Sequence, residues 1–232
     1  MADFIRTVTG DISPLELGYC QCHEHLLLAK GKSYTIDPSL YMDDEKKSAD
    51  ELLSYYAAGG RALVDAQPVG CGRMADGLRR ISEASGVKII ASTGFHKLLF
   101  YPEDHVVYRS SAEELAELFA GELMLGMFVD HVNGEAPFTE RGAAKAGIIK
   151  TASDGRDITS GEDVLPIYRK LFTAAAMAAG ANIWAAFFGT EGIFTVLDRV
   201  ISFVICWLVI KVIPERTLVK FGCGSNYIKE KK

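Results

Sequence analysis

Two histidines in this sequence have the type and the spacing of metal ligands. His23 and His25 are separated by one residue, so on a β-strand both rings leave the same face while Glu24 leaves the other. Neutral imidazole binds zinc, manganese, iron or nickel, and two rings on one side of a strand end form half of a tetrahedral site. The alternative is structural, because such a pair also occurs as packed or exposed histidines without a metal.

Lys150 is the third side chain placed where chemistry is done. It ends the apolar run of residues 146–149, and a lysine at the end of a parallel strand presents its ammonium at the edge of the sheet where functional groups gather. An ammonium repels a metal ion. The residues alone therefore favour an ordinary role, with the charge in solvent or paired with an acid such as Asp154.

The elements that must position these side chains alternate along the first 186 residues. Apolar runs of strand length are expected within residues 15–28 and at residues 62–65, 87–91, 146–150 and 181–186. Segments of helical period separate these runs. Because the strands lack polar alternation, the pattern predicts an α/β fold, a parallel sheet covered by helices and either closed as a barrel or open and doubly wound.

Capping patterns predict where some of the helices begin. Ser48 and Ser111 are each followed three residues later by a glutamate, which is the pattern of a capping box at a helix start. A further helix is expected over residues 161–179, and Pro166 should kink its first turns or move its start.

Composition and charge exclude several classes of protein. The chain has 232 residues, of which 49% are hydrophobic and 24% charged, so it is not disordered, collagen-like or a coiled coil. Its net charge of −5 provides no overall field for nucleic acid or an anionic membrane. The five cysteines include no CxxC pair, and no apolar signal segment opens the chain, so we expect a cytoplasmic protein with reduced thiols.

Short motifs follow one another along the first part of the chain. They are TVTGDI at residues 7–12, ELG at 16–18, HEHL at 23–26, GG at 59–60, VD at 64–65, GCGR at 70–73, STGF at 92–95 and AGIIK at 146–150. In this order they closely resemble the phosphotriesterase family of the amidohydrolase superfamily, which includes phosphotriesterase-like lactonases and phosphotriesterase-related proteins. The resemblance extends over residues 1 to about 180 and fades near residue 198.

The resemblance implies a TIM (β/α)8-type barrel, here incomplete with about five to six βα units. It implies two divalent metals, zinc in the first instance, at the carboxyl ends of the strands. His23 and His25 would bind the more buried metal. Lys150 would be carboxylated, bridge both metals and serve in catalysis, where a metal-bound hydroxide attacks the ester bond of a lactone or phosphate ester. His96 lies near the position of the family's substrate contact after the third strand.

The sequence departs from the family pattern after Lys150. The family takes two more histidine ligands from strands five and six and an aspartate from strand eight, but none of the five histidines follows Lys150, and residues 186–187 at the end of the expected fifth strand are Ala and Phe. We expect a barrel portion over residues 1–198 and a divergent apolar and basic tail over residues 199–232. A reading-frame shift, a truncation or genuine divergence would each explain the change.

Three functions remain open from the sequence. The first is a metal-dependent hydrolase acting on a small-molecule ester or lactone. The second is a non-catalytic relic of the family that lacks the ligands of strands five, six and eight. The third is an interaction protein that uses the apolar residues 200–213 as a contact surface. These residues are too few to span a bilayer, because a membrane-spanning helix needs about 20 residues. Open sheet edges of an incomplete barrel would also favour a homo-oligomer.

Overall fold

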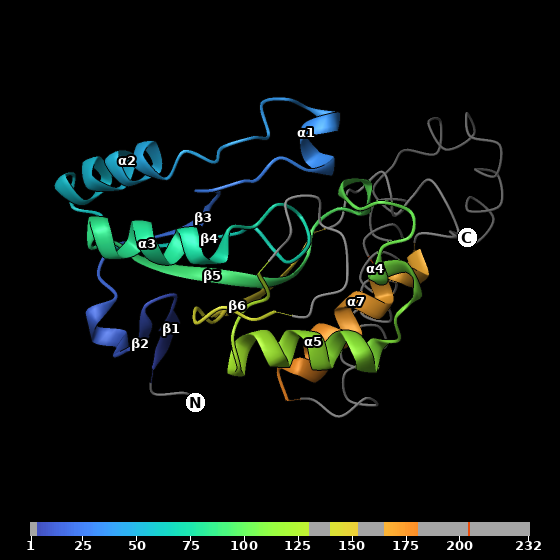
Figure 1. The fold of residues 1–232 in the computed structure, drawn as a ribbon. Coiled ribbons are helices and arrows are strands. Elements are labelled where there is room, and N and C mark those ends of the chain that lie inside the picture. Colours follow the sequence, from blue (N-terminus) through green and yellow to red (C-terminus); the bar gives the residue numbers. More distant parts are fainter. Residues whose placement is uncertain (1–3, 130–139, 153–164, 181–203, 205–232) are drawn as a thin grey trace, which may run out of the picture. The chain divides into compact units, whose positions relative to one another are not determined.

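Four parallel strands form the central sheet of the protein (Figure 1). The structure is a computed structural model that describes residues 4–129, 140–152, 165–180 and 204. The strands are β3 (Cys20–Glu24), β4 (Ala62–Asp65), β5 (Lys88–Phe95) and β6 (Ile148–Thr151), and each pairs in parallel with the next. Their order in the sheet is their order in the chain. This order favours the barrel over the doubly wound sheet, in which the strand order reverses at a switch point.

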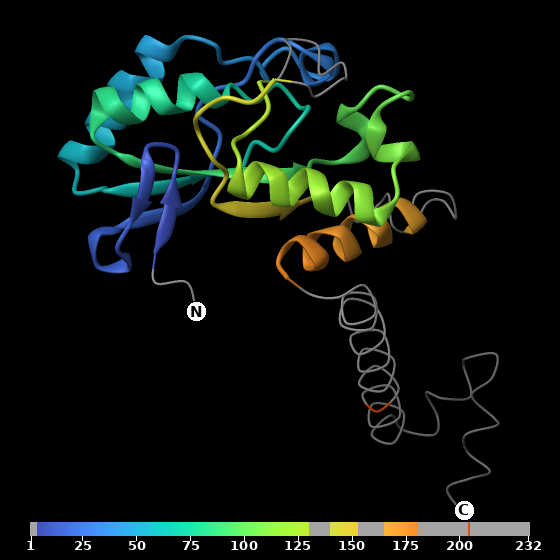
Figure 2. The same ribbon diagram turned by 60° about the horizontal axis from the view of Figure 1, so that its bottom comes forward.

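The longer helices lie in two pairs. Helix α2 (Glu45–Ala57) packs on α3 (Ala75–Ser85), and α5 (Ala112–Met124) packs on α7 (Leu165–Ala178), as Figures 1 and 2 show. Short helical turns lie in the loops, and they are η1 (Pro14–Glu16), α1 (Lys32–Ile36), η2 (Leu98–Phe100) and α4 (Val106–Arg109). The parallel sheet with interleaved helices confirms the predicted fold class.

Four of the five predicted strands are confirmed, one of them with an extension. Strands β3, β4 and β6 lie where apolar runs predicted them, but β5 continues to Phe95, four residues beyond the predicted run. Residues 92–94 are Ser, Thr and Gly, which do not read as an apolar strand, yet they are buried and pair with residues 148–150 of β6. The fifth strand predicted at residues 181–186 lies outside the described residues.

Helix starts agree with the capping prediction at one of the two serines. Ser111 caps α5 with a complete capping box. The box at Ser48 is wrong, because α2 begins at Glu45 and Asp44 is its cap, with its carboxylate accepting a hydrogen bond from the Lys47 N–H at 3.0 Å. The Ser48 hydroxyl instead donates to the Leu26 carbonyl at 2.7 Å and ties α2 to the loop after β3.

The helix predicted over residues 161–179 is described as α7, Leu165–Ala178, with Pro166 near the start of its described part. Residues 161–164 lie outside the described residues, so the effect of Pro166 on the start of the helix stays a prediction.

An antiparallel hairpin that the sequence reading did not predict precedes the sheet. Its strands are β1 (Ile5–Thr7) and β2 (Gly10–Ile12). The Val8 N–H donates to the Ile89 carbonyl at 2.9 Å, close to the start of β5. The motif at residues 7–12 therefore places the hairpin at the amino-terminal end of the parallel sheet.

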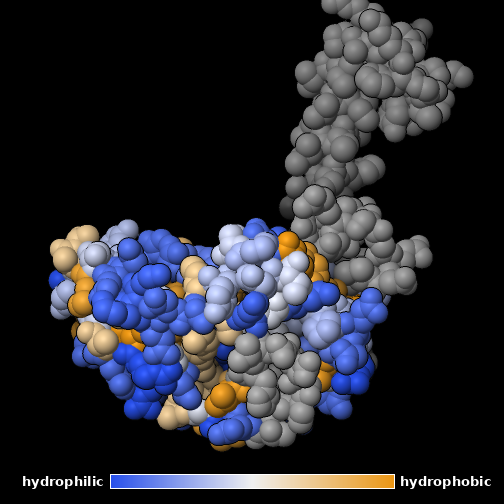
Figure 3. Space-filling model, turned by 45° about the horizontal axis from the view of Figure 1, so that its top comes forward, coloured by the Kyte–Doolittle hydropathy of each residue, from blue (hydrophilic) through white to orange (hydrophobic). Residues whose placement is uncertain are grey.

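Two apolar clusters form the core. One packs between the sheet, α2 and α3 and includes Leu52, Leu78 and Ile89. The other surrounds α5 and α7 and includes Phe119 and Leu171. In Figure 3 the exposed face is mainly hydrophilic with small apolar patches, which is usual for a folded domain.

The chain divides into two compact units, residues 1–186 and 187–232. Only Val204 of the second unit is described, so the domain boundary expected at residue 198 stays a prediction. Among the described residues, none of the helices has the length and apolar character needed to cross a membrane.

Candidate metal centre

The two histidines of the HxH motif lie side by side at the carboxyl end of β3. Their ring centroids are 5.4 Å apart and the ring planes make an angle of 66°. His23 is exposed and His25 is partly buried. The one-residue spacing thus brings the two rings together, as expected for alternate residues near a strand end.

His96 and Lys150 come from the two strands farther along the sheet. His96 directly follows β5, and its ring lies 6.2 Å from that of His25 and 4.8 Å from that of Phe100. Lys150 is in β6, in register with Gly94 of β5. The carboxyl ends of three strands therefore bring together all four side chains that the sequence singled out.

Burial and the neighbouring lysine keep the imidazoles of His25 and His96 neutral. Burial, reinforced by the charge of Lys150, lowers the pKa of His25. The same two causes lower the pKa of His96 to about 3. Both rings are therefore uncharged at neutral pH, which is the state in which imidazole can bind a metal.

The lysine itself is shifted toward its neutral form. Burial lowers the pKa of Lys150 to about 8, although the nearby Cys71 and Asp65 oppose the shift. At pH 7 about one amine in ten is then neutral. A neutral amine is the form of lysine that can attack an electrophile such as carbon dioxide.

Two side chains at the carboxyl end of β4, Asp65 in the strand and Gln67 just beyond it, lie next to the histidine pair. Asp65 is fully buried, and its carboxylate accepts the N–H groups of Leu26 at 2.8 Å and Gln67 at 3.0 Å. Burial raises the pKa of Asp65 to about 6. The Gln67 side chain hydrogen-bonds to the side chain of His25 and donates to the Cys71 carbonyl. Asp65 thus holds the main chain next to His25, while Gln67 holds the ring.

Gln67 was absent from the residues that the sequence reading selected. Glutamine belongs to no common metal or catalytic pattern, and its contact with His25 joins residues 42 positions apart. The signal that could have found it is its place, two residues beyond the end of a strand at the edge where the other site residues gather.

The donor set fits one half of a metal centre. Within the described ranges, no three His, Cys, Asp or Glu side chains gather closely enough to hold a metal ion. The imidazoles of His23 and His25 supply ligand atoms of a kind that zinc accepts, and Lys150 lies close to His25. The end of the expected fifth strand at residues 186–187, and His131, lie outside the described residues. His105 belongs to a different region, where it is buried and caps α4.

Comparison with known proteins places this arrangement in a family. The sequence profile of the phosphotriesterase family matches residues 3–184. A phospho-furanose lactonase of Mycoplasmopsis agalactiae (strain NCTC 10123 / CIP 59.7 / PG2) is 33% identical over 157 residues, which are 65% of this chain and 43% of that protein. An aryldialkylphosphatase of Saccharolobus solfataricus is 27% identical over 169 residues, 72% of this chain and 48% of that protein.

Solved structures agree with these relatives. An amidohydrolase from Mycoplasma synoviae superposes with a TM-score of 0.68 at 29% identity, covering 77% of this chain and 50% of that one. A lactonase from Listeria monocytogenes superposes with a TM-score of 0.61 at 26% identity, covering 75% of this chain and 53% of that one. The chain thus spans about half the length of the relatives it matches, and its fold is that of an incomplete barrel of their type.

Proposed function

Since the chain belongs to the phosphotriesterase family, we propose that it is a metal-dependent hydrolase that cleaves the ester bond of a lactone or a phosphate ester. The observation that carries this proposal is the convergence of His23, His25 and Lys150 from two strands of the sheet. Lys150 is close enough to His25 for its charge to lower the pKa of that ring. The imidazole of His25, whose pKa is lowered, lies 5.4 Å from the ring of His23 and close to an amine of lowered pKa, and this grouping supports the proposal.

The first chemical step in this proposal concerns Lys150 alone. The neutral Nζ attacks the carbon of carbon dioxide, a new N–C bond forms, and a proton leaves to solvent. The product is a carbamate whose two oxygens carry one negative charge. Carboxylation therefore converts a cation that repels metals into an anionic oxygen ligand, and the lowered pKa of Lys150 supports this step.

The other residues of the site would bind the metal and orient its ligands. His23 and His25 would each contribute a ring nitrogen, and Gln67 would fix the orientation of the His25 ring through its hydrogen bond. Divalent metals, zinc in the first instance, would supply a Lewis acid and a nucleophile at neutral pH. His96 remains neutral at neutral pH and lies beside His25, so we assign it to substrate contact.

One observation favours the alternative of a non-catalytic relic. No histidine follows Lys150 in these 232 residues, so the two further imidazole ligands of the family pattern are not present in this sequence. A relic would keep the fold and bind no stoichiometric metal. The two functions therefore differ in a quantity that is simple to measure.

The deciding experiment is the metal content per chain, by elemental analysis of protein purified with zinc and bicarbonate. The hydrolase proposal predicts about one to two zinc ions per chain. The variants His23→Ala/His25→Ala and Lys150→Ala should lose most of them. Lys170→Ala is the matched control, because Lys170 is also a partly buried lysine of lowered pKa but lies on α7 with its ammonium on the Val107 carbonyl.

The zinc content distinguishes the hydrolase from the non-catalytic relic. Zinc that is retained by wild type and lost from the site variants supports the hydrolase, and screening of lactones and phosphotriesters with and without chelator then follows. A zinc content near zero in wild type contradicts the proposal and favours the relic.

A further inference from the structure

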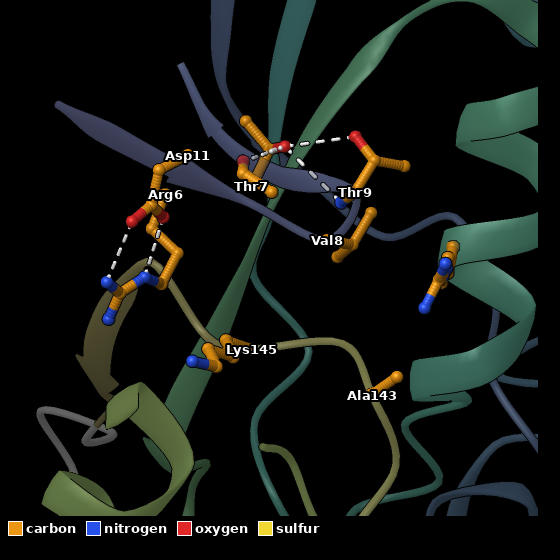
Figure 4. A pocket seen from close by; sticks show the side chains of 9 residues that line it. Arg6, Thr7, Val8, Thr9, Asp11, Ala143 and Lys145 are labelled. Carbon is orange, nitrogen blue, oxygen red and sulfur yellow. Dashed lines mark hydrogen bonds and ion pairs between the residues drawn. The ribbon is translucent and has the colours of Figure 1, made fainter. Parts of the chain in front are cut away.

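A polar hollow lies at the opposite end of the sheet from the candidate metal centre. Its volume is about 240 Å³, and it lies between the β1–β2 hairpin, Arg79 of α3 and the segment before β6 that carries Lys145 (Figure 4). The hairpin is anchored near the start of β5 by Val8. The candidate metal ligands all lie at or near the other ends of the strands, so the two sites are separate.

One wall of the hollow is a fixed ion pair. Arg6 donates to both carboxylate oxygens of Asp11, at 2.8 and 3.0 Å, and also to the Leu123 carbonyl. The pair cancels its own charge and holds the two hairpin strands together. Thr7 adds to this rigidity, because its hydroxyl donates to the Gly10 carbonyl at 2.7 Å across the turn.

The other walls carry positive charge that is only partly balanced. Among the described residues Lys145 makes no hydrogen bond or ion pair, although it lies close enough to Asp11 for its charge to lower the pKa of that carboxyl. Arg79 pairs with Glu83 at 2.9 Å through Nε, and among the described residues its two terminal nitrogens have no partner. The lining therefore holds three cations and a single carboxylate, Asp11, which is already bound by Arg6.

We propose that this hollow binds a small divalent oxyanion, the phosphate group, between the side chains of Lys145 and Arg79. A guanidinium with free terminal nitrogens suits the paired oxygens of phosphate, and an ammonium adds a second charge-assisted hydrogen bond. A volume of about 240 Å³ leaves room for the anion with some of its water. Free phosphate and the phosphate of a small monoester present the same group to these residues. This inference does not depend on the proposed hydrolase activity.

The test is a calorimetric titration of the full chain with inorganic phosphate. A chelator is present throughout so that no phosphate binds through a metal ion. The ionic strength is held constant so that charge screening is the same at every phosphate concentration. Wild type is expected to bind one phosphate per chain. Lys145→Gln and Arg79→Gln should each weaken binding about tenfold, because each removes one charge-assisted contact.

The matched control is Arg80→Gln. Arg80 is on the same helix and next in sequence to Arg79, but its guanidinium pairs with Glu45 and does not line the hollow. It should leave phosphate affinity unchanged. Circular dichroism melting of each variant confirms that the fold is retained, as expected for side chains that are not part of the core.

A parallel titration with glycerol phosphate distinguishes the two sources of the group. Tighter binding than inorganic phosphate identifies a monoester as the ligand, and weaker binding identifies the free anion. The proposal is overturned if wild type binds no phosphate, or if both glutamine variants bind it as wild type does. It is also overturned if His23→Ala/His25→Ala abolishes binding, which would place the anion at the other end of the sheet.

Discussion

The main chain of Lys150 lies directly against the α-carbon of Gly94, in the space that a side chain on Gly94 would fill. Gly94 has a φ of +98°, which is the left-handed region that favours glycine, and a Cβ built there overlaps the Lys150 carbonyl oxygen. The glycine therefore permits the close approach of β5 and β6 at the point where Lys150 meets the histidines.

Gly94→Ala should destabilise the fold and disturb the position of Lys150. We expect a loss of about 2–6 kcal/mol in the free energy of unfolding, since left-handed strain and overpacking each cost about 1–3 kcal/mol. Urea unfolding measures this loss. Gly59→Ala is the control, because Gly59 has a φ of +104° with open space around it and should cost only the strain. Equal losses in the two variants would show that the contact with Lys150 is not tight.

A buried ion pair joins the loop after β4 to α5. Arg73 and Glu122 are both fully buried, and two guanidinium nitrogens of Arg73 reach the Glu122 carboxylate at 2.6 and 2.9 Å. Arg73 also donates to the Ser92 and Phe128 carbonyls. Burial alone would raise the pKa of Glu122, but the charge and hydrogen bonds of Arg73 lower it.

Arg73→Met should therefore destabilise the protein by about 3–5 kcal/mol, because it leaves a buried carboxylate without its partner. Chemical unfolding at pH 7 tests this expectation. The double variant Arg73→Met/Glu122→Leu should recover part of the loss, since no buried charge remains. A double variant as unstable as Arg73→Met would show that the main-chain contacts of the two side chains, including the Phe128 N–H that Glu122 accepts at 2.8 Å, carry the energy and that the ion pair does not.

The sequence predicted the parts of the fold that depend on local patterns. Strand β4 and the capping box at Ser111 follow from runs and spacings within a few residues. The capping box at Ser48 was wrongly predicted because Asp44, one turn earlier, is an equally good cap. The hydrogen bond of Ser48 to the Leu26 carbonyl, a tertiary contact, leaves Asp44 as the cap.

The candidate site shows the same division. The HxH spacing alone predicted that the rings of His23 and His25 would leave one face, but Lys150 became a candidate ligand only through the family resemblance. The contact of Gln67 with His25 could not be predicted from the sequence, because it joins segments that are distant in the chain. The same holds for Glu122 as the partner of Arg73, which lies 49 positions away. Such pairs are set by the packing of elements and leave no local pattern.

Gln67→Ala should weaken zinc binding, and it should also cost about 1–3 kcal/mol of stability because it removes the buried hydrogen bond to the Cys71 carbonyl. Gln67 holds the ring of His25, and removal of such an orienting partner typically costs about 10–100-fold in metal affinity. Competition with a chromophoric chelator measures the affinity. Gln67→Glu keeps an acceptor for the His25 N–H and should restore much of it. Wild-type affinity in Gln67→Ala would contradict the orienting role.

The lowered pKa of Lys150 predicts an unusual pH dependence of its reactivity. Burial favours the neutral amine, so half of the Lys150 side chains should be deprotonated at about pH 8. In the unfolded chain the same lysine keeps its proton to about pH 10.4. The buried ammonium therefore lowers the free energy of unfolding by a constant amount below pH 8. This destabilisation disappears as the pH rises from about 8 to about 10.4, where the folded state has already lost the proton.

Site-resolved acetylation of the metal-free protein with acetic anhydride measures the neutral fraction, because only the unprotonated Nζ attacks the anhydride. The labelling rate of Lys150, normalised to its plateau, should reach half its maximum near pH 8. Lys46 is the internal control, since its ion pair with Asp50 raises its pKa and its rate should climb only at higher pH. If the two lysines shared one profile, Lys150 would be an ordinary ammonium at neutral pH, and the carboxylation on which the proposed metal centre depends would lose its physical basis.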